Sequence, residues 1–163
     1  MIEIREAAPD EWDEAGRVTA DAYREFARDT DWESYLGRIA DVRGRADRTT
    51  ILVALDGGRV VGSATLEVEG RVEPEDEPTL RPGEAHIRMV GVSADTRAGG
   101  VGRLLMEACE ARARAAGKTF VTLHTTQRMT AAQAMYGKLG YERDADRDLG
   151  GGFVLLSFSK RLV

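Results

Sequence analysis

The stretch Arg97-Ala98-Gly99-Gly100-Val101-Gly102 decides the fold of this chain, because it joins an apolar run to a long amphipathic segment. The run His86 to Val92 predicts a strand, and residues 101–116 carry apolar side chains at helical spacing, which predicts a helix. A glycine turn between strand and helix leaves the first N–H groups of the helix without intrahelical partners. Together with the positive end of the helix dipole, these groups form a site for phosphate. Glycines at 99, 100 and 102 let an anion approach the backbone closely, and we expect a positive φ in the turn.

Two common phosphate-binding patterns do not fit this turn. The Rossmann fingerprint needs Gly-x-Gly-x-x-Gly, and a P-loop places Lys and Ser or Thr after its last glycine, where this chain has Arg103 and Leu104. The turn instead matches the pattern Arg/Gln-x-x-Gly-x-Gly/Ala. About thirty residues further on, residues 131–141 read Ala-Ala-Gln-Ala-Met-Tyr-Gly-Lys-Leu-Gly-Tyr. In this order and at this spacing, the two motifs resemble those of the GNAT superfamily of acetyl-CoA-dependent N-acetyltransferases over residues 84–141.

The bulk properties predict one small enzyme domain over residues 1–163. No apolar run is long enough to span a membrane, and the N-terminus lacks a signal-peptide pattern, so we expect a cytoplasmic protein without a membrane partner. The single cysteine, Cys109, excludes an intrachain disulfide and is expected to be a small packed side chain rather than a nucleophile. A net charge of −5 with interspersed signs argues against a nucleic-acid partner.

The rest of the chain predicts an α/β fold with a mixed sheet. Predicted strands cover residues 2–5, 50–55, 60–68 and 119–125, a hairpin turn lies at 56–59, and a last pair begins at 141 and ends with 153–160. Predicted helices begin at Pro9, at Thr30 with a capping box to Glu33, and at Thr130, the last ending at Leu139. The resemblance implies a GNAT-like acyl-CoA N-acyltransferase fold: a mostly antiparallel central sheet with splayed fourth and fifth strands, flanked by about four helices.

The resemblance also implies where acetyl-CoA binds. Pantetheine would pair with the backbone of the strand that ends at Val92, and the pyrophosphate would rest on helix N–H groups. Arg97 and Arg103 would add positive charge near the adenosine phosphates, although either can be an ordinary surface charge. Gln133 replaces the asparagine of the family motif and can bond pantetheine or backbone. The expected cofactor-binding residues are Met89, Val90, Val92, Arg97, Gly99, Gly100, Val101, Gly102, Arg103, Leu104, Gln133 and Tyr136.

Acetyl transfer to an amine needs a base, a polarised carbonyl and a donor for the leaving thiolate. By resemblance, the hydroxyl of Tyr136 would donate to the sulfur, and a strand N–H near Val90 would polarise the carbonyl; the alternative for Tyr136 is a packed core tyrosine. Many relatives have a glutamate where this chain has His86, two places after Glu84. Either residue could relay a proton through water, and we favour His86, whose ordinary pKa is near 6.5. The alternative is that His86 faces solvent or is hydrogen-bonded in the sheet.

Three further features bear on the acceptor and on metals. His124 lines the acceptor side of the pocket or orients the loop that follows it, and both interpretations stay open. The acidic run Glu73, Glu75, Asp76 and Glu77 is a solvated hairpin tip or the rim of an entrance for a cationic amine. The two histidines are far apart in sequence and no ligand cluster is present, so no metal site is predicted.

The resulting hypothesis is an N-acetyltransferase that moves acetyl from acetyl-CoA directly to a primary amine, on a small molecule or a peptide, within a ternary complex. The alternative is a non-catalytic acyl-CoA-binding sensor or regulatory module on the same fold. The presence of Tyr136 favours the enzyme. We expect the first two helices and residues 144–152 to select the acceptor, and the resemblance is compatible with a homodimer.

Overall fold

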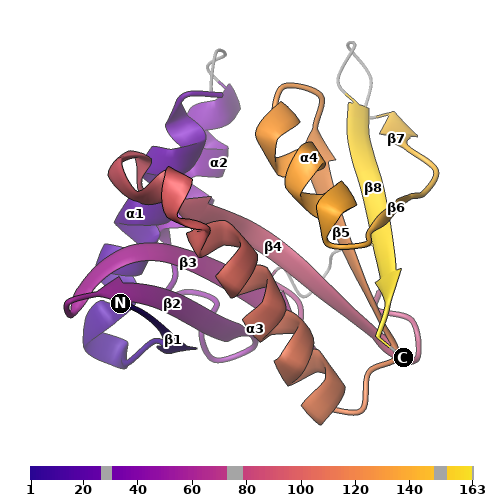
Figure 1. Cartoon of the computed structure of the whole chain (residues 1–163), viewed down its shortest axis with the longest axis horizontal. Coiled ribbons are helices and arrows are strands. Elements are labelled where there is room, and N and C mark those ends of the chain that lie inside the picture. The colour runs from indigo at the N-terminus through magenta and orange to yellow at the C-terminus, as the bar shows by residue number, and fades with distance from the viewer. Residues whose placement is uncertain (27–30, 73–78, 149–153, 163) are drawn as a thin grey trace.

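The computed structural model describes residues 1–26, 31–72, 79–148 and 154–162 (Figure 1). Two short 3-10 helices, η1 and η2, accompany the regular elements. In chain order the elements are β1 (Ile2–Glu6), η1 (Pro9–Glu11), α1 (Trp12–Arg24), α2 (Asp31–Ala40), β2 (Thr50–Asp56), β3 (Arg59–Glu67), β4 (Glu84–Val92), η2 (Ala94–Gly99), α3 (Val101–Ala115), β5 (Phe120–Thr126), α4 (Thr130–Lys138), β6 (Glu142–Arg143), β7 (Arg147–Asp148) and β8 (Val154–Arg161).

The strands form one sheet in the order β1-β2-β3-β4-β5-β8-β6, with β7 also paired to β8. Each described pairing is antiparallel except that of β4 with β5. This confirms the mixed, mostly antiparallel sheet that the resemblance implied.

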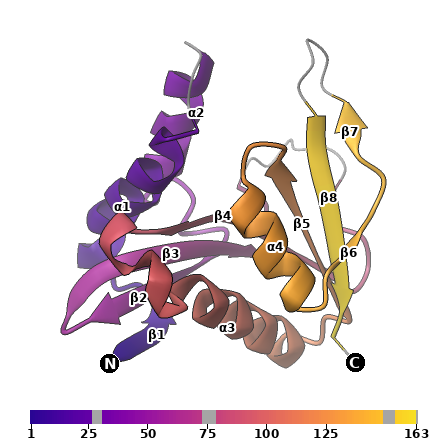
Figure 2. The ribbon, with the colours of Figure 1, turned by 45° about the horizontal axis from the view of Figure 1, so that its top comes forward.

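β4 and β5 pair over only part of their length. The pairing runs from Glu84 opposite Phe120 to Ile87 opposite Leu123. Beyond it, β4 continues to Val92 and β5 to Thr126, and the two strands diverge (Figures 1 and 2). The expected splay between the fourth and fifth strands is therefore confirmed.

Helices cover both faces of the sheet, as the alternation of side chains along β2 shows. Leu52 and Ala54 pack in the cluster that contains Leu105 of α3. Ile51 and Val53, one residue out of phase, pack in the cluster that contains Val18 of α1. Therefore α1 and α3 lie on opposite faces, and the α3 face carries the larger core. None of the described helices is long and apolar enough to cross a membrane.

The structure differs from the predicted elements at several ends. η2 separates β4 from α3, where a simple glycine turn was expected. The strand expected from residue 141 is split into the two-residue strands β6 and β7, whose residues are all on the surface. Thr30 of the predicted capping box, the acidic run 73–77 and part of the expected 144–152 loop lie outside the described residues.

The contact between α1 and α2 yields a stability prediction. A methyl group at Gly16 of α1 would lie 2.0 Å from the carbonyl oxygen of Ala40, whereas one at Gly37 of α2 would meet nothing within 4 Å. We expect Gly16→Ala to lower the free energy of unfolding by about 1–3 kcal/mol through overpacking. The matched Gly37→Ala should raise it by about 0.5–1 kcal/mol, because alanine is the better helix former. Urea denaturation measures both changes, and equal effects would contradict this account of the contact.

Candidate active site

A β-bulge in β4 lies at the point where the two central strands separate. Opposite β3, Arg88 pairs with Thr65 but Gly91 pairs with Ser63, so two residues of β4 face one of β3. Met89 within the bulge has a φ of 54°, a conformation that costs a non-glycine residue about 1–3 kcal/mol. The bulge changes the alternation of β4, so the side chain of Met89 packs on the α1–α2 side. Bulges and such strained residues gather at functional sites.

The N-terminus of α3 is open in the way that phosphate binding requires. Gly100 is the N-cap with a φ of 74°, which confirms the expected positive φ in the turn. None of the side chains that the structure describes caps this end, so the first N–H groups of α3 have no partner there. A methyl group at Gly99 or Gly100 would meet nothing within 4 Å. At Gly102 it would lie 3.2 Å from the sulfur of Met135, so this glycine also permits α3 to approach α4.

The two expected phosphate-side arginines already have partners in the protein. Arg97 forms an ion pair with Glu25, just beyond the end of α1. Arg103 forms an ion pair with Glu107, one turn further along α3, at 2.8 Å. Both arginines are about half exposed, so a phosphate could recruit them only in competition with these carboxylates.

Gln133 makes the backbone contact that was one of its two expected uses. Its Nε2 donates to the carbonyl of Thr126 at 2.9 Å, which ties α4 to the end of β5. Val90 and Val92 are partly buried against the α3-side core.

Tyr136 of α4 is 6 % exposed and stands over the β5–β8 part of the sheet. Its ring lies 5.6 Å from that of Phe158 and 6.0 Å from that of Tyr141. Burial raises the pKa of its hydroxyl to about 12, so the group is protonated at neutral pH. No other described residue hydrogen-bonds this hydroxyl, which therefore remains available as a donor. The sequence left two roles open for Tyr136, a packed core side chain and a hydrogen-bond donor. The structure is compatible with both.

His86 and Glu84, alternatives for the base in the sequence, are joined by a third residue. Nδ1 of His86 lies 2.7 Å from Oγ1 of Thr122 on β5. The same hydroxyl donates to Oε2 of Glu84 at 2.5 Å, and Oε1 of Glu84 accepts from the backbone N–H of Arg81 at 2.8 Å. His86 is only 5 % exposed, so it does not face bulk solvent.

The two titratable members of this cluster are shifted in the same direction for different reasons. Burial lowers the pKa of His86 well below its ordinary value, helped by His124, Arg88 and Arg71, so the ring is neutral at neutral pH. Burial alone would raise the pKa of Glu84, but hydrogen bonds from Arg81 and Thr122 outweigh it and lower the pKa. Glu84 is therefore ionised.

His124 lies beside His86 although the two are distant in sequence. The ring centroids are 5.0 Å apart, and Nδ1 of His124 lies 3.0 Å from Oγ of Ser157 on β8. Burial, with a contribution from Arg147, lowers the pKa of His124. Because β4 and β5 stop pairing at Leu123, His124 stands at the start of the split. Among the described residues, no three His, Cys, Asp or Glu side chains gather as a metal site would require.

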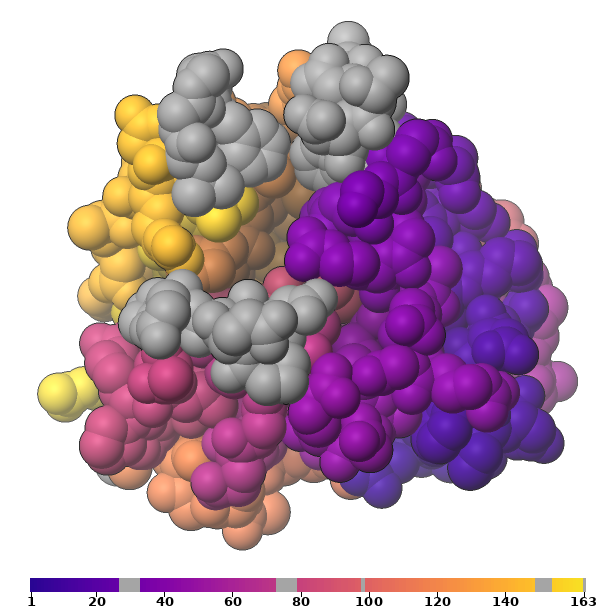
Figure 3. Space-filling view, turned by 180° about the vertical axis from the view of Figure 1, so that it is seen from behind, coloured from indigo at the N-terminus to yellow at the C-terminus, as the bar shows by residue number. Residues whose placement is uncertain are grey.

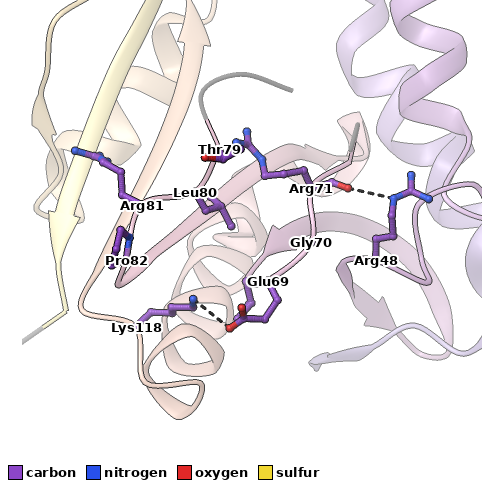
Figure 4. A pocket seen from close by; sticks show the side chains of 10 residues that line it. Arg48, Glu69, Gly70, Arg71, Thr79, Leu80, Arg81, Pro82 and Lys118 are labelled. Carbon is purple, nitrogen blue, oxygen red and sulfur yellow. Dashed lines mark hydrogen bonds and ion pairs between the residues drawn. The ribbon is translucent and has the colours of Figure 1, made fainter. Parts of the chain in front are cut away.

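The face opposite α3 is hollowed between the C-terminal strands and the N-terminal helices (Figure 3). A separate cavity of about 520 Å³ lies beside the start of β4 and β5 (Figure 4). Its basic side chains are engaged: Arg48 donates to the carbonyl of Val72 at 2.7 Å, and Lys118 lies 3.3 Å from Glu69. None of the expected acetyl-CoA residues lines it.

Sequence reasoning missed Thr122 and Tyr23. Thr122 and His124 are two apart on a strand, so they share a face, but only the register of β4 against β5 places Thr122 opposite His86. Tyr23 on α1 packs beside Met89, and its ring meets that of Tyr35 edge-on at 6.4 Å. Burial raises the pKa of Tyr23 well above its ordinary value, although the nearby Val90 backbone amide lowers it. An α1 tyrosine thus lies next to the proposed carbonyl-polarising N–H.

The buried neutral histidine predicts a pH-dependent stability. The pKa of His86 is lower in the folded than in the unfolded chain, so the buried neutral ring makes its full contribution to the free energy of unfolding above about pH 6.5. This contribution is lost as pH falls toward the folded pKa. The free energy of unfolding should therefore decrease between about pH 6.5 and 5, above the carboxylate range. His86→Asn should flatten this decrease in urea titrations. Parallel pH profiles for the two proteins would contradict the assignment.

Comparison with known proteins identifies relatives over most of the chain. The acetyltransferase (GNAT) family model matches residues 4–141. Mycothiol acetyltransferase of Geodermatophilus obscurus is 28% identical over 129 residues, which are 79% of this chain and 40% of that protein. The chain thus spans about two fifths of the length of this curated relative.

Solved structures share the fold. The yncA protein of Salmonella typhimurium, solved with its cofactor acetyl-CoA, has a TM-score of 0.73 at 19% identity, covering 99% of this chain and 94% of that one. The ribosomal-protein-S18-alanine N-acetyltransferase of Escherichia coli has a TM-score of 0.73 at 17% identity, again covering 99% and 94%. The match to the family model includes β4, β5 and the N-terminus of α3. The chain therefore belongs to the acetyltransferase (GNAT) family.

Proposed function

We propose that this chain transfers the acetyl group of acetyl-CoA directly to a primary amine within a ternary complex. The observation that carries the proposal is the alignment of three features along one split in the sheet. These are the unpaired edge of β4 beyond Ile87, the uncapped N-terminus of α3 at its open end, and the buried tyrosine of α4 beside it. Membership of the family and the acetyl-CoA of the Salmonella relative support the same assignment.

The described residues fit acetyl-CoA. Beyond Ile87, none of the described strands pairs with β4 on its β5 side, so the backbone of Met89 to Val92 has an edge that pantetheine could join. The N–H groups at Val101 to Arg103 would hold the pyrophosphate, with Gly99 and Gly100 leaving the approach open. The N–H of Leu104, which the sequence also suggested, instead donates to the carbonyl of Gly100 at 3.1 Å. Acetyl-CoA supplies an acyl carbon that an amine can attack and a thiolate that can leave.

The chain supplies three functions around that carbon. His86, neutral and buried, would accept the proton of the acceptor amine, directly or through water. The backbone N–H of Val90, which already interacts with the Tyr23 hydroxyl, would turn to the carbonyl oxygen as negative charge develops there. Tyr136 would donate to the leaving sulfur. With a pKa of about 12 against about 8.5 for a simple thiol, Tyr136 serves the thiolate better by hydrogen bonding than by complete proton transfer.

The acceptor is an amine of unassigned identity. The relatives include a mycothiol acetyltransferase and an enzyme named for an alanine of ribosomal protein S18. A first screen should therefore contain both small amines and peptides with N-terminal alanine, with thiol release as the readout. The cytoplasmic location and the homodimer remain predictions.

A single substitution in the glycine turn tests where acetyl-CoA binds. Gly100→Glu places a bulky negative side chain where the pyrophosphate would rest, so calorimetry should show at least a tenfold loss of acetyl-CoA affinity. Gly100→Asn is the matched control, because asparagine tolerates the left-handed conformation without adding charge. The control should bind more tightly than the glutamate variant. Failure of the folded wild-type protein to bind acetyl-CoA would refute the proposal.

A second substitution separates the enzyme from a non-catalytic acyl-CoA sensor. Tyr136→Phe keeps the packing against Phe158 but removes the donor, so kcat should fall about tenfold or more while acetyl-CoA affinity stays nearly constant. Initial rates at saturating amine and calorimetry measure the two quantities. Unchanged turnover would remove Tyr136 from the chemistry, and acetyl-CoA binding without transfer to any amine would favour the sensor.

A further inference from the structure

The hydrogen-bond donors in the cluster of Glu84, Thr122 and His86 can be counted. The count assigns which ring nitrogen of His86 carries the hydrogen. A threonine hydroxyl has one hydrogen to donate. Glu84 is ionised and can only accept, so the hydrogen of Thr122 points to Oε2 of Glu84 at 2.5 Å. The hydroxyl oxygen then meets Nδ1 of His86, at 2.7 Å, as an acceptor. Nδ1 must therefore carry the hydrogen.

We infer that Thr122 is a positioning residue: held by Glu84, it fixes His86 as the Nδ1–H tautomer and leaves Nε2 as the proton acceptor. The catalytic part of this inference rests on the proposed function, whereas the tautomer is a property of the free protein. When Nε2 takes the proton of the amine, both ring nitrogens carry hydrogen. The positive ring then faces ionised Glu84 through the Thr122 hydroxyl, and no proton needs to leave the cluster.

The geometry of the sheet holds this arrangement rigid. His86 and Thr122 are directly opposed in the last part of β4 and β5 that remains paired. Glu84, two residues before His86, lies on the same face of β4 and is anchored by the backbone of Arg81. All three residues of the cluster are less than 9 % exposed.

Other charged or titratable groups face His86 from the neighbouring elements. Arg88 follows it on β4, His124 lies beside it on β5, and Glu67 of β3 is its cross-strand partner. Arg71, after β3, forms an ion pair with Glu67 at 3.1 Å. The nearby cations oppose protonation of His86. Ionised Glu84, acting through the Thr122 hydroxyl, favours protonation of the ring during catalysis.

The test reads the tautomer directly and does not require an acceptor. The protein has two histidines, so NMR of the full chain with histidine isotope-labelled at both ring nitrogens gives one signal pair each for His86 and His124. At neutral pH we expect a protonated Nδ1 and an unprotonated Nε2 for His86. Thr122→Val should abolish this preference, and Thr122→Ser, which keeps the hydroxyl, should retain it. Ser157→Ala is the matched control, since it should alter His124 and leave the tautomer of His86 unchanged.

Kinetics then connect the tautomer to the reaction. Thr122→Val should lower kcat about tenfold or more and shift the acid limb of the pH–rate profile, at nearly constant acetyl-CoA affinity, and Thr122→Ser should restore both. A purely structural role would not follow the hydroxyl in this way. A protonated Nε2 in the wild type, or the same tautomer in Thr122→Val, would overturn the inference. The expected tautomers without transfer to any amine would sustain the tautomer assignment and count against the proposed function instead.

Discussion

The pairing of β4 with β5 over only four residue pairs is the constraint on which the rest of the site depends. Beyond these pairs, β4 is held by α1, which packs so closely that a methyl group at Gly91 would lie 3.0 Å from the Cα of Thr19. β5 is held instead by β8, with which it pairs along its whole length, and by α4 through Gln133. Beyond their paired residues the two strands are thus held by different elements, although both contribute to the core on the α3 face. The bulge at Met89 lies in the part of β4 that diverges from β5.

The connection between these strands determines where phosphate can bind. β4 and β5 are parallel, so the chain must return from the end of β4 to the beginning of β5, and α3 makes this return. The N-terminus of α3 therefore lies at the open end of the split, and its C-terminus at the paired end. The N-terminus of α3, which can bind an anion, and the edge of β4, which can bind an extended group, thus adjoin each other. Acetyl-CoA would use both.

The paired end carries a different chemistry. Close pairing brings Thr122 opposite His86 and brings His124 beside it, in surroundings that keep both histidines neutral at neutral pH. The Thr122 hydroxyl then bridges Glu84 and His86, each of which has a lowered pKa. Such perturbed neighbours are typical of functional sites rather than of ordinary sheet interiors.

Local patterns in the sequence were sufficient for the longer helices and strands and for their order. Periodicity located α1, α3 and the hairpin of β2 and β3, and the glycines at 100 and 117 lie where the turns need a positive φ. The bulge at Met89 and the ion pair of Arg97 with Glu25 were not predictable, because each depends on packing between segments distant in the chain.

The sequence by itself determined the α/β order, the glycine turn before α3 and the position of Tyr136, since these follow from spacing along one segment. Only the tertiary structure decided that Thr122 joins His86 to Glu84, because one residue of slip between β4 and β5 would turn the threonine to the other face. It also decided that two histidines distant in sequence are neighbours. Strand register is a property of two segments together, and neither segment encodes it alone.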